Sequence, residues 1–166
     1  MKLLVPYYSQ RDNAVDWWRT CNSSSMAMCV QYLKPGCISG DDDYIYRLAS
    51  YGDTTDHSAH TYLLADLGIN SSWRTDLSYA DLDAQLDKGK PIPIGVLHKG
   101  TLNHPTGGHI CVVVGKEAGG YICHDPWGHG FSYNDHNGED CYYPYQSLDA
   151  RWLVEGASTG WGRIFK

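Results

Sequence analysis

Several features are scarce in this chain of 166 residues. Phenylalanine occurs only twice, and no two of the six cysteines have the Cys-x-x-Cys spacing of a zinc knuckle. No stretch approaches the roughly 18 apolar residues that a membrane-spanning helix requires. Basic residues are also outnumbered, with 13 Lys and Arg against 19 Asp and Glu and a formal net charge of −6. These shortages disfavour a membrane protein, a structural zinc domain and a nucleic-acid-binding protein, which would carry the opposite charge.

The N-terminus also lacks the pattern of a secretion signal. Its apolar run is short, and Pro6 interrupts it. We therefore expect a cytoplasmic protein. The length fits one domain, spanning residues 1–166, with no requirement for a metal or a cofactor. We expect this domain to be a monomer.

Polar aromatic residues and reactive side chains are abundant instead. The chain has 13 Tyr, 6 Trp and 8 His besides its 6 Cys. In the first half, apolar spacing and capping residues predict a helix that begins near Cys21 and stops at Pro35, and further helices over about 41–50, 58–67 and from Ser78. In the second half, strands are predicted over 91–97, 110–114, 121–124, 142–143 and 152–154. Helices followed by an antiparallel sheet indicate the α+β class.

The residues after the strand at 110–114 predict a hairpin. A register that pairs Cys111 with Cys123 also pairs His109 with Asp125, so these two side chains are expected opposite each other or one step apart. A carboxylate at that position orients an imidazole and stabilises its charged form.

Cys21 is the candidate nucleophile. It stands at the predicted start of a helix, where free N–H groups and the helix dipole stabilise a thiolate. Its neighbours Arg19, Thr20, Asn22 and Ser23 are polar, unlike those of a core thiol. If this helix packs on the hairpin, Cys21, His109 and Asp125 converge into a nucleophile, a base and an orienting group. Cys29, Cys111 and Cys123 are interpreted as small apolar packing residues, whereas Cys37 and Cys141 lie in predicted loops and have no assigned role.

The order of these motifs resembles the papain-clan cysteine peptidases. The resemblance is carried by Val5 to Gln10, by Cys21 opening a helix, by Gly107-Gly108-His109 before an apolar strand, and by His124-Asp125-Pro126-Trp127-Gly128. Within that clan, the chain is most similar to the bacteriocin-processing, or double-glycine, peptidases. The resemblance implies a papain-like fold in which the nucleophile helix of an N-terminal helical half packs on a C-terminal antiparallel sheet. It also implies the roles of nucleophile for Cys21, base for His109, orienting group for Asp125 and oxyanion donor for Gln10.

Two features depart from that family. The family's Cys-Gly-Pro is replaced by Cys21-Asn22-Ser23, and Gln10 precedes Cys21 by 11 residues with Trp17 and Trp18 between them. This spacing is longer than usual for papain-like enzymes, so the role of Gln10 is less well defined than that of the triad.

The tail from Val154-Glu155-Gly156 through Gly160-Trp161-Gly162-Arg163 also resembles small single-domain versions of this fold encoded by tailed bacteriophages. That likeness implies an endolysin that cleaves the peptide crosslinks of peptidoglycan and reaches the cell wall only through a pore. Trp17, Trp18, Trp127 and Gly108 are the candidate substrate-binding residues, although the three tryptophans are equally compatible with core packing.

Other functions stay open from sequence. The same fold suits an intracellular processing protease acting on a peptide, or an amidase that cuts between glycan and stem peptide. A different class, a metal-dependent hydrolase or a zinc-binding module, would use Cys21, His109 and Asp125 as ligands.

Overall fold

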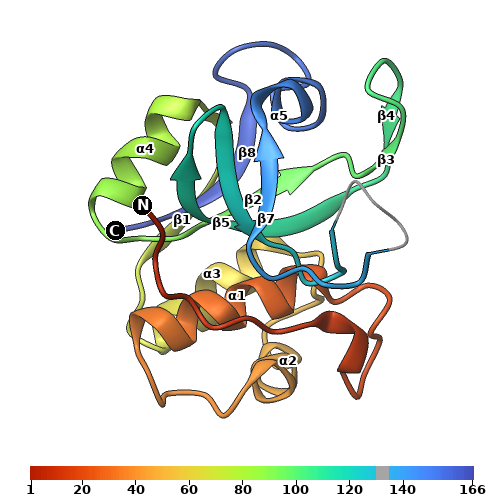
Figure 1. Ribbon diagram of the computed structural model, residues 1–166. Coiled ribbons are helices and arrows are strands. Elements are labelled where there is room, and N and C mark those ends of the chain that lie inside the picture. The colour runs from red at the N-terminus through yellow and green to blue at the C-terminus, as the bar shows by residue number, and fades with distance from the viewer. Residues whose placement is uncertain (130–134) are drawn as a thin grey trace.

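A six-stranded antiparallel sheet runs through the middle of the computed structural model, which describes residues 1–129 and 135–166 (Figure 1). Its strand order is β1-β8-β2-β5-β6-β7, and β3 and β4 form a separate two-stranded ribbon. The strands are β1 (Ser71–Leu77), β2 (Ile92–Val96), β3 (Lys99–Gly100), β4 (Pro105–Thr106), β5 (His109–Glu117), β6 (Gly120–His124), β7 (Cys141–Pro144) and β8 (Gly160–Phe165).

Helices cover both faces of the sheet. The first three lie on one face, and the last two lie on the other (Figure 1). They are α1 (Cys21–Leu33), α2 (Asp41–Leu48), α3 (His57–Asp66), α4 (Tyr79–Asp87) and α5 (Tyr145–Arg151), and a short 3₁₀ helix spans Gln10–Asp12. Among the described residues, no helix is both long enough and apolar enough to cross a membrane.

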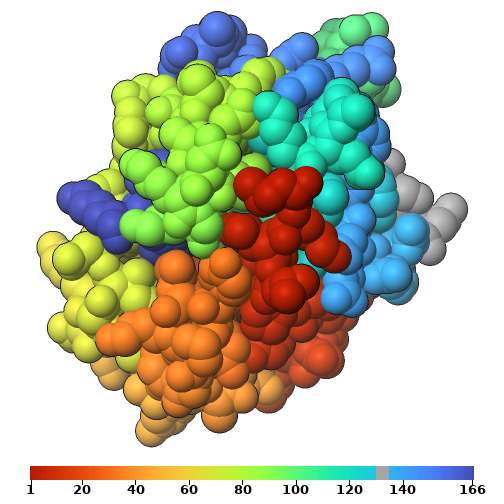
Figure 2. Space-filling view, turned by 60° about the vertical axis from the view of Figure 1, so that its left-hand side comes forward, coloured from red at the N-terminus to blue at the C-terminus, as the bar shows by residue number. Residues whose placement is uncertain are grey.

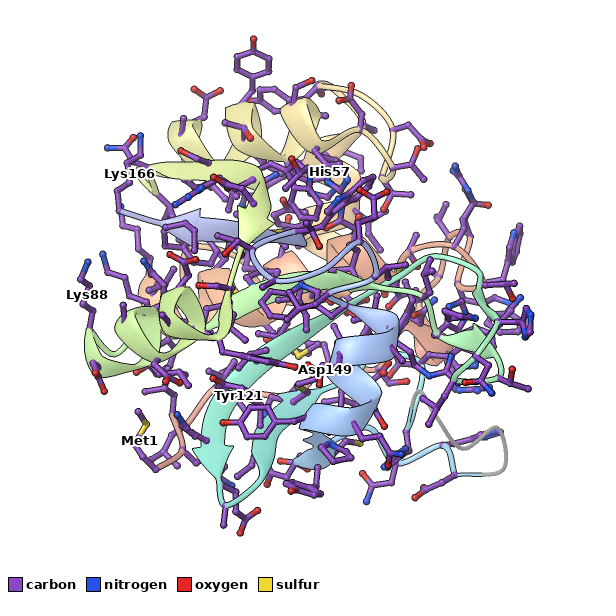
Figure 3. The ribbon with its side chains drawn as sticks, turned by 90° about the horizontal axis from the view of Figure 1, so that it is seen from above. Met1, His57, Lys88, Tyr121, Asp149 and Lys166 are labelled. Carbon is purple, nitrogen blue, oxygen red and sulfur yellow. The ribbon has the colours of Figure 1, made fainter. Side chains whose placement is uncertain are left out.

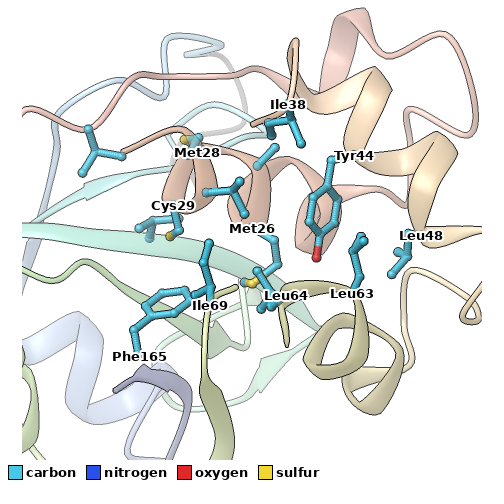
Figure 4. Packing of buried hydrophobic residues seen from close by; sticks show 14 of the residues in the cluster. Met26, Met28, Cys29, Ile38, Tyr44, Leu48, Leu63, Leu64, Ile69 and Phe165 are labelled. Atoms are coloured by element: carbon cyan, nitrogen blue, oxygen red, sulfur yellow. The ribbon is translucent and has the colours of Figure 1, made fainter. Parts of the chain in front are cut away.

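The alternation of side chains along β5 divides the interior into two cores. Val112 and Val114 pack with residues of α1, α2 and α3, the cluster seen in Figure 4. Cys111 and Val113 point to the opposite face and pack with residues of α4, α5 and β2. Because both faces are covered, β5 is apolar on both sides and reads in sequence as a continuous buried run.

Helix α1 lies deep in the molecule, and its start is fixed by polar contacts. All residues from Asn22 to Val30 are buried, although they include three consecutive serines, Ser23 to Ser25. Ser24 Oγ donates to Asp41 Oδ2 (2.8 Å), and Ser25 Oγ donates to the carbonyl of Ile110 (3.2 Å). These bonds satisfy the buried hydroxyls and hold the first turn of α1 against the start of β5.

The N-terminal segment crosses the surface beside β5 (red in Figure 2). Lys2 forms an antiparallel bridge with Gly115, and Leu3 N donates to Val114 O (2.8 Å). Further along, Gln10 N donates to Pro126 O (2.9 Å). The segment therefore connects the C-terminal part of β5 to the turn that follows β6.

The β5–β6 hairpin forms as predicted, but its register differs. Val113, not Cys111, pairs with Cys123, and a bulge follows between Val113 and Gly115. The turn is centred later than expected, because Glu117 pairs with Gly120, and this shifts the pairing by three positions near the turn. The extra residue at Val114 reduces the shift to two positions beyond the bulge. A bulge leaves no mark in the spacing of apolar residues, so the sequence did not reveal it.

The α+β class is confirmed, with α1 packed on the sheet as expected. The strand predicted at 152–154 is wrong, because Trp152 caps the end of α5 and a turn follows it. The sequence analysis also missed β1 and β8. Strand β1 carries exposed charged residues in its middle and β8 is rich in glycine, so neither shows the apolar alternation of a typical strand.

Candidate active site

Cys21 and His109 meet where the start of α1 abuts the start of β5. Cys21 is the first residue of α1 and half-buried, and His109 is the first residue of β5 and buried. Burial opposes ionisation of the thiol. The positive charge of His109 and hydrogen bonds from His109 and the Ile110 N–H outweigh it, so the pKa of Cys21 is lowered. This is the environment of a reactive thiolate.

His109 is held by Asp125, which follows β6. His109 Nε2 lies 2.6 Å from Asp125 Oδ1, and both side chains are buried. Burial favours the neutral ring, but the charges of Asp125 and Cys21 prevail and raise the pKa of His109. Because Nε2 is hydrogen-bonded to the Asp125 carboxylate, Nδ1 is the ring nitrogen left to form the hydrogen bond with Cys21. The expected proximity of His109 and Asp125 thus holds despite the shifted register.

Asp125 is itself fixed from several sides. Its Oδ1 also accepts a hydrogen bond from Trp127 N (3.0 Å), and its Oδ2 accepts one from the Tyr143 hydroxyl. Its backbone N–H donates to Gly138 O (2.7 Å), and its carbonyl accepts from Tyr7 Oη (2.7 Å). A carboxylate this constrained keeps the imidazole in one orientation.

Gln10 lies near this group without lining the cleft. Its side chain is 1% exposed, and its Nε2 donates to Trp17 O (2.7 Å). The carbonyl of Trp17 therefore takes one of the two amide hydrogens. Its main-chain bond to Pro126 ties Gln10 to the turn directly after Asp125.

The three tryptophans proposed as substrate-binding residues form a separate surface cluster. Trp17 stacks on Trp127 with ring centres 5.7 Å apart, and Trp18 meets Trp17 edge-on. The guanidinium carbon of Arg11 lies over Trp127, 4.1 Å from the ring centre. Trp17 and Trp18 are 41% and 60% exposed. None of the three lines the cleft at Cys21, so they are neither core residues nor walls of that cleft.

A cleft of about 530 Å³ opens beside Cys21 and His109, and Gly108 lies on its wall. A side chain at Gly108 would meet no protein atom within 4 Å. The absence of a side chain here leaves open space beside His109, in agreement with the room for substrate expected from the Gly-Gly pair.

Two further residues next to the catalytic group escaped the sequence analysis. Tyr143 was predicted only as part of a strand, and its bond to Asp125 depends on the β6–β7 pairing. The His98 ring lies 4.9 Å from that of His109, and burial together with the charge of His109 lowers the pKa of His98 to about 4. A neutral His98 leaves the positive charge of the site on His109.

The ligand set required by the metal-site alternative is not assembled. Within residues 1–129 and 135–166, no group of three or more His, Cys, Asp or Glu side chains is arranged to hold a metal ion. All six cysteines are free thiols.

Comparisons with known proteins agree with this geometry. The "Peptidase_C39 like family" matches residues 2–152 of the chain. One similar solved structure is a double glycine motif protease from an AMS/PCAT transporter in complex with the leader peptide. It has 16% identity and a TM-score of 0.61, and the match covers 99% of this chain and 93% of that one. Another, classed as a C39-like peptidase from Bacillus anthracis, has 16% identity, a TM-score of 0.65 and coverage of 98% and 96%. No curated protein matches in sequence.

Proposed function

The chain belongs to the Peptidase_C39 like family of cysteine peptidases, and we propose that it hydrolyses peptide bonds with Cys21 as nucleophile, His109 as general base and Asp125 as the orienting group. The observation that supports these roles is the contact of Cys21 with His109, itself bonded to Asp125 at 2.6 Å. The lowered pKa of Cys21 and the raised pKa of His109 favour a thiolate–imidazolium pair.

The reaction is acyl transfer to water. The Cys21 thiolate attacks the amide carbonyl, a C–S bond forms, and the carbonyl oxygen becomes an oxyanion. His109 gives its proton to the leaving nitrogen as the C–N bond breaks. Water, deprotonated by His109, then attacks the thioester, releases the carboxylic acid and restores the thiol. No cofactor takes part in these steps.

The oxyanion is proposed to bind at the start of α1. The first N–H groups of a helix have no intrahelical acceptor, so the Cys21 N–H is available there. As the second donor we propose the Gln10 amide hydrogen that Trp17 O does not take. Because Gln10 does not line the cleft, this role requires its side chain to turn toward the start of α1 when substrate binds. Each such donor contributes about 3 kcal/mol in comparable sites.

For the substrate, we propose the peptide crosslinks of peptidoglycan, cleaved by an endolysin-like enzyme as the sequence likeness implies. The exposed rings of Trp17 and Trp18 close to the Gln10 segment support contact with a polar polymer. The second candidate is a processing protease acting on a peptide, supported by the leader peptide bound to one of the similar structures.

Digestion of purified peptidoglycan, followed by mass spectrometry of released fragments, separates these candidates. New amino termini within crosslinks support the endolysin function, and a cut between sugar and stem peptide identifies an amidase. Cleavage of peptides with no fragments from peptidoglycan favours the processing protease. Cys21→Ala should abolish every activity, and Cys37→Ala, which changes a half-buried loop thiol, serves as the matched control.

The metal-dependent alternative predicts the opposite inhibitor pattern. A cysteine peptidase loses activity with iodoacetamide and keeps it with a chelator such as EDTA. Loss of activity with EDTA together with resistance to iodoacetamide would reject the thiol mechanism.

A further inference from the structure

The cleft beside Cys21 has an aromatic wall. It is lined by His57, Trp73 and Trp161, which come from α3, β1 and β8. His57 Nδ1 lies 3.5 Å from Nδ2 of Asn22, the residue that follows Cys21. Figure 3 shows His57 at the base of α3, next to the edge of the sheet formed by β1 and β8. Neither β1 nor β8 was foreseen in sequence, so this wall was not either.

The aromatic wall is rigidly built. The rings of His57 and Trp73 stack with centres 3.6 Å apart and planes 8° from parallel, and Trp161 stands edge-on to Trp73 at 6.5 Å. Behind them, the fully buried guanidinium of Arg163 donates to the His57 carbonyl at 2.9 Å. Its other nitrogen donates to the hydroxyls of Thr61 (2.7 Å) and Ser71 (3.0 Å), which ties α3 to β1.

The wall is also uncharged. Burial and the nearby charge of Arg163 lower the pKa of His57, so its ring is neutral at pH 7. Arg19, at the rim of the same cleft, is paired with both oxygens of Asp53 at 2.8 Å. The three rings therefore offer planar, uncharged surfaces to a ligand. The other charged residues that line the cleft are Arg151 and Glu155.

A glycine provides the room between these rings. At Gly95 on β2, an added Cβ would stand 3.5 Å from Trp161 Cβ and from Ile110 Cδ1, and 3.7 Å from Trp73 Cη2. These are ordinary van der Waals distances, so one carbon fits and a branched side chain would occupy the space between the two tryptophans. Because residue 95 is glycine, the space between Trp73 and Trp161 stays open to a ligand.

We propose that this aromatic pocket, formed by His57, Trp73, Trp161 and Gly95, binds an aromatic side chain of the peptide substrate located within three residues of the scissile bond. The proposal rests on the proposed peptidase function and adds a specificity determinant to its second candidate, the protease that processes a peptide. The crosslinks of peptidoglycan contain no aromatic side chains, so an aromatic preference would favour that candidate over the endolysin. A flat ring matches the stacked and edge-on surfaces of the pocket, whereas a glycine would leave them solvated. The continuity of the pocket with Cys21 and His109 sets the short distance to the reacting bond.

The test is digestion of a synthetic library of randomised octapeptides, with the products sequenced by mass spectrometry. We expect Phe, Tyr or Trp to be enriched at least tenfold over Ala at one fixed position near the cut, a discrimination typical of an apolar pocket. Gly95→Val and Trp161→Ala should each reduce this preference to threefold or less. Tyr46→Ala, which removes an aromatic ring that is 82% exposed on α2, is the control and should leave it unchanged.

A second measurement keeps this proposal separate from the peptidase function. Cys21→Ala, immobilised and incubated with the same library, should retain peptides rich in aromatic residues, and the additional change Gly95→Val should abolish that retention. Cleavage without aromatic preference, or a preference that survives both pocket variants, overturns the proposal and leaves the peptidase function standing. No cleavage of either the library or purified peptidoglycan by the unaltered protein, combined with aromatic retention by Cys21→Ala, upholds the pocket and refutes the peptidase function.

Discussion

Removing the hydroxyl of Tyr143 tests how the orientation of His109 depends on Asp125. Three hydrogen bonds reach the Asp125 carboxylate from described residues, namely those of His109, Trp127 and Tyr143. Tyr143→Phe removes one of them and keeps the shape of a fully buried ring. A hydrogen bond to a charged group contributes roughly 1.5–3 kcal/mol. If that stabilisation is lost in the transition state, kcat should fall about 10- to 100-fold.

The fall should appear in kcat and not in KM, because Tyr143 contacts Asp125 and does not line the cleft. Steady-state kinetics on a peptide substrate measure both constants, and thermal denaturation checks that the variant is folded. Tyr142→Phe is the matched control, since the neighbouring Tyr142 hydroxyl donates to Ala118 O (2.8 Å) at the hairpin turn. Activity of Tyr143→Phe within twofold of the unaltered protein would refute the reasoning.

Three further predictions follow from the same contacts. The rate should rise with pH well below the ordinary thiol pKa of 9.0, as Cys21 ionises. It should fall again well above the ordinary imidazole pKa of 6.5, as His109 loses its proton. A rise only near pH 9 would contradict the ion pair. Gly108→Ala should keep the melting temperature within about 2 °C, because its Cβ meets no protein atom, yet raise KM several-fold; an unchanged KM argues against substrate at this wall. Arg163→Met should lower the free energy of unfolding in urea by about 2–4 kcal/mol, since three buried hydrogen bonds are lost, and a loss under 0.5 kcal/mol would show that they contribute little.

Local patterns in the sequence were sufficient to predict that Cys21, His109 and Asp125 lie close together. The helix at Cys21, its end before Pro35 and the start of α4 at Ser78 depend on neighbouring residues, and the structure has all three. The approach of His109 to Asp125 also survived the register error. Side chains two residues apart along a strand lie on the same face, so a shift of two in the paired positions leaves them within reach.

Features that depend on distant parts of the chain were not predictable in the same way. Strand β8 pairs with both β1 and β2, and only that pairing brings Trp161 next to Trp73 and Gly95. The bulge at Val114 lies where the distant N-terminal segment bridges Gly115. Trp17 was a candidate for the groove, or equally for the core, because it is close in sequence to Cys21. It stacks on Trp127 in a surface cluster that does not line the cleft. Proximity in sequence was therefore a poor guide to the lining of the cleft.

The central claim is that Cys21 is a thiolate activated by His109, and the five other cysteines are internal controls for it. The direct measurement is the alkylation rate of each cysteine by iodoacetamide at pH 6 in the folded protein, followed by peptide mass spectrometry. Our account predicts that Cys21 reacts at least tenfold faster than Cys37, which is also half-buried, and that His109→Ala removes this difference. Equal rates at Cys21 and Cys37 in the unaltered protein would contradict it.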